Sequence, residues 1–150
     1  MNKFIVNVEV VIIHKDKWLL VRRSSSESHA AGLLSLVGGK VDVDDSKNNT
    51  LEYAALREIN EEIGVKLDRK LIYVHSSQFV SERGNNVLDV VFSLVLSERP
   101  KIKPSEEIAQ YLWLNYGEIT KKEDLPQWVK NSIEKAYIKK SAGPGILPTI

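Results

Sequence analysis

The middle of this 150-residue chain carries a helical pattern between segments that are typical of β-strands. Its apolar residues recur at intervals of four, at Leu51, Ala55, Ile59 and Ile63. Thr50 is expected to be the N-cap, Glu52 favours the first turn, and Gly64 is well placed to end the helix. A helix with one apolar stripe buries it against another layer of structure, so the pattern predicts a packed, one-sided helix.

Strand-like segments account for most of the other apolar residues. They cover residues 4–13, 17–22, 33–39, 71–80, 87–96 and 109–114. We expect the first two to pair, and 71–80 and 87–96 to form a hairpin in which both strands are substantially buried. A second helix is predicted over residues 127–139, after Pro126. This order of elements predicts an α+β fold or a sandwich of helices on a mixed sheet.

Length and composition indicate one domain. We assign residues 1–140 to this domain and residues 141–150, which contain two prolines and two glycines, to an irregular tail. The formal net charge of +1 argues against a broad surface for nucleic acid or membrane. Cysteine is absent, which excludes a disulfide scaffold, a thiol nucleophile and a thiolate zinc site. With no signal-peptide or membrane-spanning pattern, a cytoplasmic protein is expected.

Three glutamates fall on one face of the predicted helix. Glu58, Glu61 and Glu62 are related by three and four residues, so their carboxylates emerge together beside the apolar stripe. Their repulsion costs roughly a few tenths of a kcal/mol per pair on an exposed helix, and a hard divalent cation would reverse that sign. Mg²⁺ fits best because it accepts carboxylates and keeps waters that phosphates can replace. The alternative is an ordinary solvated helix face.

The segment REINEEIGV, residues 57–65, follows the glycine pair in GGK at 38–40 and an acidic loop. This arrangement resembles the signature of the Nudix hydrolases. The second half of that signature is matched at each fixed position, by Arg57, Glu58, Ile59, Glu61, Glu62, Gly64 and Val65. The resemblance extends over roughly residues 4–138 and implies a Nudix-type α/β/α sandwich with a mixed β-sheet between helices.

The first half of the signature departs from the family pattern, in which a glycine, five residues, a glutamate and seven more residues precede the arginine. Counting forward from Gly39 places Asp45 at the glutamate position and leaves eleven residues before Arg57, four more than in the family. Counting back from the helix places Asn49 there instead, which leaves no acid at that position. The sequence leaves both alignments open.

The resemblance to mutator-type nucleoside triphosphate pyrophosphatases adds a fourth carboxylate. In those relatives a glutamate six residues before a tryptophan reaches the metal site from a loop, and Glu107 stands six residues before Trp113. Glu106 is the alternative to Glu107, and an exposed loop acid is the simpler interpretation of both. The implied metal ligands are Glu58, Glu61, Glu62 and Glu107.

The same resemblance implies the remaining functional residues. The catalytic residues would be Arg57, Glu58, Glu61 and Glu107, with Glu58 or Glu107 as the general base. Arg57 would orient a neighbouring carboxylate, because its planar fork suits bidentate contact. The substrate-binding residues would be Arg23, Gly38 and Gly39, with Arg23 on a phosphate or base and the glycines offering backbone groups. His29 belongs to the same nucleotide-binding region in this comparison.

The implied activity is Mg²⁺-dependent hydrolysis of a diphosphate linkage in a nucleoside diphosphate-linked substrate, such as a nucleoside triphosphate or nucleotide sugar. Mn²⁺ is an alternative cofactor, and the resemblance leaves a homodimer open. An isomerase of the same fold is disfavoured because it needs a catalytic cysteine, which this chain lacks. A catalytically silent domain that senses a nucleotide or metabolite is the other alternative. The altered first half of the signature favours it, whereas the intact helix acids oppose it.

Overall fold

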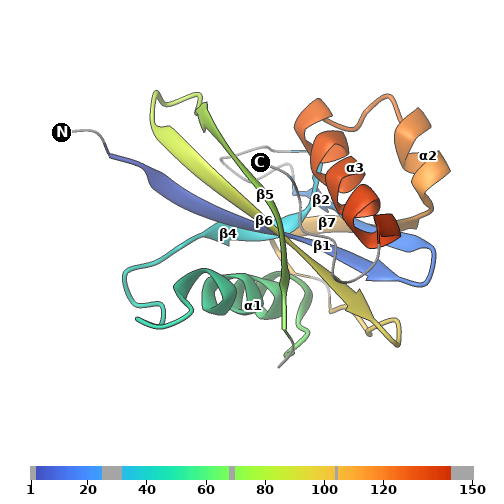
Figure 1. Ribbon diagram of the computed structural model, residues 1–150, viewed down its shortest axis with the longest axis horizontal. Coiled ribbons are helices and arrows are strands. Elements are labelled where there is room, and N and C mark those ends of the chain that lie inside the picture. The colour runs from blue at the N-terminus through green and yellow to red at the C-terminus, as the bar shows by residue number, and fades with distance from the viewer. Residues whose placement is uncertain (1–2, 25–31, 68–69, 104, 143–150) are drawn as a thin grey trace.

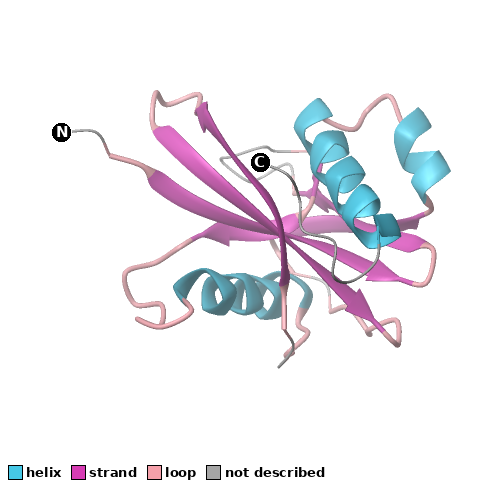
Figure 2. Ribbon diagram, viewed as in Figure 1, coloured by secondary structure: helices cyan, strands magenta, loops and turns pink. Residues whose placement is uncertain are grey.

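The computed structural model describes residues 3–24, 32–67, 70–103 and 105–142. The elements in these residues are β1 (Ile5–His14), β2 (Lys17–Arg23), β3 (Leu34–Ser35), β4 (Val37–Lys40), α1 (Thr50–Ile63), β5 (Ile72–Val80), β6 (Asn86–Leu96), β7 (Ile108–Leu114), α2 (Tyr116–Lys121) and α3 (Gln127–Ala142). The strands fan out between helices on two sides (Figure 2). The fold is therefore the expected α/β/α sandwich. No helix in the described ranges has the length and apolar character needed to cross a membrane.

The sheet is mixed, and β1 lies at its centre. β1 pairs in parallel with β6 from Ile5 to His14. On its other side, β1 pairs antiparallel with β4 through residues 7–10 and with β2 through residues 13–14. β3 and β7 both pair with β2, and β5 pairs with β6 at the far edge. β2 and β4 therefore pair with different parts of β1, with β2 at its C-terminal end and β4 nearer its N-terminus.

Two hydrophobic cores lie on the two faces of this sheet. α1 covers one face, with a core that includes Val8, Val10, Ala55, Ile59 and Ile63. α2 and α3 cover the other face (Figure 1), with a core that includes Val11, Ile13, Ile119, Val129 and Ile133. Alternate residues of β1 enter opposite cores, as the two-residue period of a strand requires. The apolar stripe of α1 thus fixes which helix face is left for the glutamates.

The predicted first helix is present as α1, but its N-terminus differs from the expectation. Gly64 ends the helix as predicted, in a left-handed conformation with φ 69°, and its N–H donates to Asn60 O at 2.9 Å. Thr50 is not the N-cap, because Asn49 occupies that position with φ 50° and makes no side-chain capping bond. The Thr50 hydroxyl donates to Ser46 O at 2.7 Å instead. Thr50 therefore stabilises the preceding loop rather than the free N–H groups of the helix.

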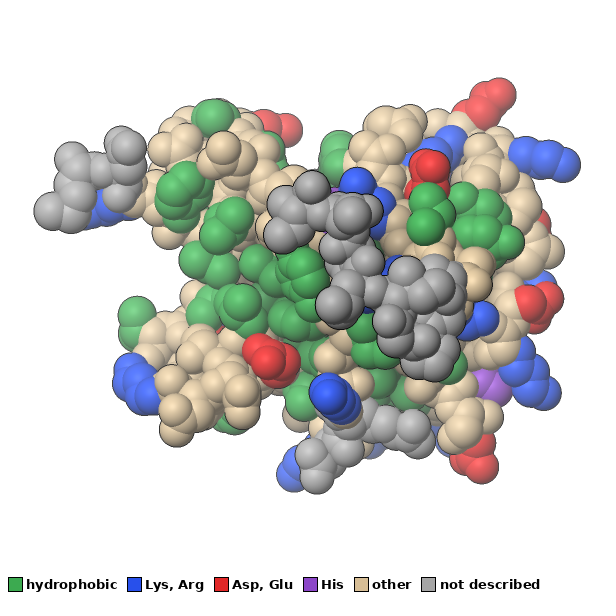
Figure 3. Space-filling model, in the orientation of Figure 1, with side chains coloured by type: hydrophobic (Ala, Val, Ile, Leu, Met, Phe, Trp, Pro, Cys, Tyr) green, Lys and Arg blue, Asp and Glu red, His purple; other side chains and the backbone are tan. Residues whose placement is uncertain are grey.

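The predicted hairpin is present, but the expected burial of both its strands is wrong for β5. β6 is largely buried between its neighbours, whereas β5 is an edge strand that pairs with β6 alone among the described strands. Four of its apolar side chains are 47–66% exposed: Ile72, Tyr73, Phe79 and Val80. Figure 3 shows hydrophobic side chains gathered near the middle of one face of the molecule. Apolar composition does not distinguish a central strand from an edge strand, because that depends on neighbours distant in sequence.

Three shorter features also differ from the expectation. Residues 33–39 form parts of two strands rather than one, since β3 pairs with β2 and β4 pairs with β1. α2 was not predicted, although a capping box between Asn115 and Glu118 marks its start. α3 continues through Ser141 and Ala142, and the rest of the expected tail lies outside the described residues.

Replacing Ile133 by alanine tests the core beneath α3. Ile133 is 0% exposed, whereas Ile138 on the same helix is 57% exposed. We expect Ile133→Ala to lower the free energy of unfolding by about 2–5 kcal/mol, and Ile138→Ala to lower it by less than about 1 kcal/mol. Urea unfolding followed by circular dichroism measures both values. Equal losses in the two variants would contradict the burial of Ile133.

Candidate functional site

Arg57 joins the loop after β4 to helix α1. Its guanidinium makes a bidentate pair with Asp45, at 2.7 Å from Nε to Oδ1 and 2.9 Å from Nη2 to Oδ2. Nη2 also donates to Lys40 O at 2.9 Å. Hydrogen bonds from Arg57 are the main reason that the pKa of Asp45 lies below its usual value. This contact supports the alignment that places Asp45, rather than Asn49, at the glutamate position of the signature.

The remaining nitrogen of the same guanidinium contacts two of the helix glutamates. Nη1 lies 2.9 Å from Glu58 Oε1 and 3.3 Å from Glu61 Oε2. These are the contacts expected of an arginine that orients its neighbours. Arg57 thus holds one carboxylate of the loop and two of the helix in fixed relative positions.

The glycine pair allows the chain to pass close to the sheet and the acids. A Cβ at Gly39 would lie 2.4 Å from the Glu58 carboxylate, and a Cβ at Gly38 would lie 2.1 Å from Val8 O. Any side chain at Gly39 would displace Glu58, and any side chain at Gly38 would disturb the pairing of β4 with β1. The glycines therefore bring backbone groups next to the glutamates.

Glu62 is buried, so the alternative of an ordinary solvated helix face does not hold for this residue. It is 1% exposed, its Oε2 has no hydrogen-bond partner, and its Oε1 lies 3.9 Å from Arg23 Nη1. Burial is the main cause that raises the pKa of Glu62 to about 8, and the charges of Glu58 and Glu107 add to it while Arg23 opposes it. A buried carboxylate oxygen without a partner is costly, and a bound cation would remove that cost.

The charges of Glu58 and Glu107 both act on Glu62, although Glu58 belongs to α1 and Glu107 to a loop. Burial raises the pKa of Glu58, Arg57 lowers it, and the charges of Glu61 and Glu107 raise it further. Glu107 is exposed, in the loop between β6 and β7, and its carbonyl accepts a hydrogen bond from Ser24 N at 2.8 Å. The main charges acting on Glu58 and Glu62 include Glu107 and not Glu106. Glu107, rather than Glu106, is thus the loop carboxylate whose charge acts on these two helix glutamates.

The predicted ligands are gathered in one region, but their oxygens are not arranged around a single point. In the described ranges, no three His, Asp or Glu side chains are grouped as a metal site, and Glu58 and Glu61 turn toward Arg57. The donor set nevertheless suits a hard divalent cation, because it consists of carboxylate oxygens and includes the unpartnered Oε2 of Glu62. The ligand roles of these residues stay a prediction. His29 lies outside the described residues.

An acidic pair on the opposite face of the sheet was missed in the sequence. Glu9 of β1 is paired in register with Gly38, is 9% exposed and shares a hydrogen bond with Asp89 of β6. Asp89 also accepts a hydrogen bond from Asn7 Nδ2 at 2.7 Å. Burial, followed by the hydrogen bond and charge of Asp89, raises the pKa of Glu9 well above its usual value. The signal available was a single acid within each of two largely apolar strands, since acids are almost never fully buried unless they are paired.

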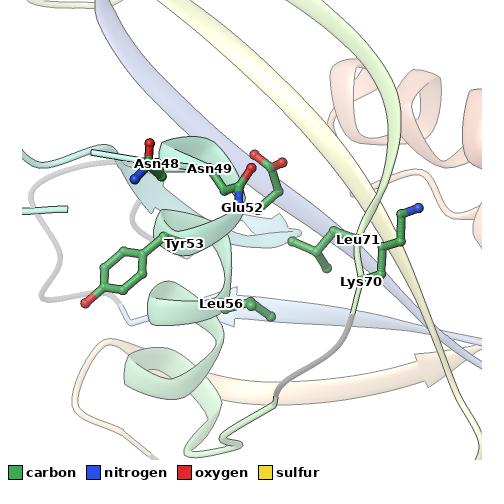
Figure 4. Close-up of a pocket in the computed structure, with 7 residues that line it drawn as sticks. All are labelled: Asn48, Asn49, Glu52, Tyr53, Leu56, Lys70 and Leu71. Atoms are coloured by element: carbon green, nitrogen blue, oxygen red, sulfur yellow. The ribbon is translucent and has the colours of Figure 1, made fainter. Parts of the chain in front are cut away.

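Two surface cavities lie away from the helix glutamates. One of about 490 Å³ is on the opposite flank of α1 (Figure 4), and the other, of about 260 Å³, lies between α2 and α3. The first is lined by Asn48, Asn49, Glu52, Tyr53, Leu56, Lys70 and Leu71. Neither cavity is lined by a residue of the predicted site. The candidate site is therefore defined by its charged residues and not by either of these cavities.

The raised pKa of Glu62 predicts a loss of stability at alkaline pH in metal-free protein. Because the pKa rises from 4.5 to about 8 on folding, the proton contributes stability that is full below about pH 4.5 and is lost as the pH rises through about 8. Glu62→Gln cannot ionise, so we expect it to be more stable than the wild type at about pH 8.5 and similar to it at about pH 4.5.

Urea unfolding in the presence of a chelator measures this difference at each pH. Glu106→Gln is the matched control, because Glu106 is exposed and lies next to the proposed loop ligand. We expect Glu106→Gln to follow the wild-type pH dependence. If Glu62→Gln also followed it, Glu62 would not titrate between these pH values.

Solved structures of similar fold come from several organisms. A MutT protein from Methanosarcina mazei Go1 is 26% identical, with a TM-score of 0.78 over 93% of this chain and 96% of that chain. A NUDIX hydrolase from Nitrosomonas europaea is 25% identical, with a TM-score of 0.74 over 99% of this chain and 98% of that chain. The NUDIX domain of Shewanella oneidensis NrtR, in a complex with ADP ribose, is 20% identical, with a TM-score of 0.74 over 93% of this chain and 90% of that chain.

The family assignment follows from a match along most of the sequence. The family model described as the NUDIX domain matches residues 3–136. A search of curated proteins found no match. The matched range contains the glycine pair, α1 with its glutamates and the loop that carries Glu107. The chain belongs to the Nudix family and is a pyrophosphohydrolase that acts on phosphorus-containing anhydrides.

Proposed function

We propose that the protein is a Mg²⁺-dependent hydrolase that cleaves the diphosphate linkage of a nucleoside diphosphate-linked substrate, such as a nucleoside triphosphate or a nucleotide sugar. Mn²⁺ is the alternative cofactor. The observation that carries this proposal is the environment of Glu62. Its side chain is buried, its Oε2 has no hydrogen-bond partner, and the negative charges of Glu58 and Glu107 act on it. A cluster of carboxylates raises the electrostatic energy of the folded protein when no counter-ion is bound, and a bound cation lowers it.

The proposed metal site uses oxygen donors from helix α1, from the loop between β6 and β7, and from strand β4. Its ligands would be Glu58, Glu61, Glu62 and Glu107, with a backbone carbonyl of Gly38 or Gly39. A bound divalent ion supplies charge neutralisation for phosphate oxygens and makes a water more acidic. Mg²⁺ is favoured because the donors are hard oxygen atoms and the described residues of the site include no imidazole or thiolate.

Glu58 is the proposed general base. Its burial, with the charges of Glu61 and Glu107, raises its pKa, and a raised pKa brings a carboxylate closer to the range in which it accepts a proton near neutral pH. Arg57 is a positioning residue, because it contacts Glu58 and Glu61 and is itself held by Asp45. Arg23, beside Glu62, is proposed to contact a phosphate of the substrate.

Release of phosphate and pyrophosphate from a panel of nucleoside triphosphates, nucleotide sugars and dinucleotides tests the proposal. Each substrate is assayed with Mg²⁺, with Mn²⁺ and with excess chelator. We expect turnover only with metal, and a loss of about 100-fold or more in Glu61→Gln and Glu62→Gln, because each variant removes a charged ligand. Glu106→Gln is expected to stay within about twofold of the wild type.

Binding without turnover would favour the sensor alternative. The observation in its favour is the long loop between Gly39 and Arg57, which departs from the family pattern. ADP ribose and the other nucleotides of the panel are therefore also titrated calorimetrically against the metal-loaded protein. Tight binding with no product from any substrate would contradict the proposed activity.

Substitution of Asp45 tests the positioning role of Arg57. We expect Asp45→Asn to lower kcat by about tenfold with a smaller change in KM, because asparagine preserves the size of the side chain but loses the charge that fixes Arg57. Asp44→Asn is the control, since Asp44 is exposed in the same loop. Steady-state kinetics on the best substrate of the panel measures both. Equal activity of the two variants would show that Asp45 does not set the position of Arg57.

A further inference from the structure

The hydroxyl of Tyr111 lies between the last turn of α1 and the loop that carries Glu107. Its oxygen is 3.2 Å from Glu62 O and 3.0 Å from Lys103 O, so it donates toward two carbonyls that are distant in sequence. We infer that Tyr111 is a positioning residue that ties this loop to α1 and thereby holds Glu107 beside Glu58 and Glu62. This inference rests on the proposed function, because it assumes that Glu107 serves the metal site.

The Tyr111 side chain is itself held by the sheet. Tyr111 belongs to β7 and is paired in register with Val21 of β2. Its ring packs, partly buried, against the core beneath α1. The hydroxyl therefore projects from a rigid strand toward the helix end. A donor fixed in this way can restrain a loop, whereas a donor on the loop itself would move with it.

A second contact joins the same loop to the same helix end. Lys103 N donates to Ile63 O at 3.1 Å. Gly64 makes this approach possible, because a Cβ at Gly64 would lie 3.0 Å from Lys103 Cβ. The carbonyls of Glu62 and Ile63 belong to the last turn of α1, where backbone acceptors lack partners within the helix. The loop thus donates one hydrogen bond to the helix end, from Lys103 N. The Tyr111 hydroxyl adds a contact with one carbonyl of the loop and one of the helix.

The position of Glu107 is set where its loop meets the end of β2. Ile108, the next residue, is paired in register with Arg23 of β2, and Arg23 Nη1 lies 3.9 Å from Glu62 Oε1. Carboxylates brought together in this way repel one another when ionised, so the loop needs attachments to keep Glu107 there. The far end of the loop is held where Ser24 N donates to Glu107 O at 2.8 Å. Tyr111 restrains the near end, four residues earlier at Lys103.

A double-mutant cycle tests whether Tyr111 acts through Glu107. The variants are Tyr111→Phe, Glu107→Gln and the double mutant, with Tyr73→Phe as control because its hydroxyl contacts only Ser76 among the described hydrogen bonds and lies in β5. Steady-state kinetics gives kcat and KM, and calorimetric titration with Mn²⁺ in the absence of substrate gives the metal affinity. Hydrogen–deuterium exchange of the segment 98–107 reports the freedom of the loop.

We expect Tyr111→Phe to lower kcat by about tenfold with little change in KM, to weaken Mn²⁺ binding by about three- to tenfold, and to speed exchange in the segment 98–107. In the Glu107→Gln background the same change should alter kcat and Mn²⁺ affinity by less than about twofold, because Glu107 no longer has a carboxylate to place. Tyr73→Phe should match the wild type in each measurement.

Two results would overturn the inference, and they are distinguishable. If Glu107→Gln impairs activity and metal binding but Tyr111→Phe adds its full effect to it, or has none, Tyr111 does not act through Glu107 and the proposed function stands. If Glu107→Gln itself leaves kcat and Mn²⁺ affinity unchanged, the proposed ligand role of Glu107 fails and the inference fails with it.

Discussion

The geometry of the site depends on one guanidinium group. Arg57 is held by both oxygens of Asp45 and by Lys40 O, and it in turn contacts Glu58 and Glu61. A planar fork can serve acceptors on two sides at once, whereas the ammonium of a lysine would act as a single point charge. The loop before α1 is longer than in the family pattern, but one of its acids, Asp45, still contacts Arg57.

The backbone holds these acids together against their repulsion. Gly38 allows β4 to lie close against β1. Lys103 and Tyr111 join the β6–β7 loop to the last turn of α1. Hydrogen bonds and strand pairing are short-ranged and directional, so they can fix elements that carry like charges. The fold thus supplies the attachments that hold these carboxylates together.

Much of the fold was predictable because its signals are local. The stripe of α1, the cap at Gly64 and the hairpin of β5 and β6 follow from patterns within short segments. Some errors occur where a distant neighbour decides, and others where a local signal is short or has two possible uses. Whether β5 is buried depends on its place at the sheet edge, and α2 is too short to show a period. Thr50 had a capping side chain but used it in the loop, which local propensity does not reveal.

The sequence by itself determined the family, the fold class and the helix face that carries Glu58, Glu61 and Glu62, because motif spacing and helical periodicity are properties of neighbouring residues. Only the tertiary structure decided that Asp45 rather than Asn49 meets Arg57, that Glu107 rather than Glu106 acts on the helix acids, and that Glu62 is buried. Each of these depends on the approach of segments far apart in the chain. Distance and burial in space set the charge interactions of a site, and one-dimensional spacing does not contain them.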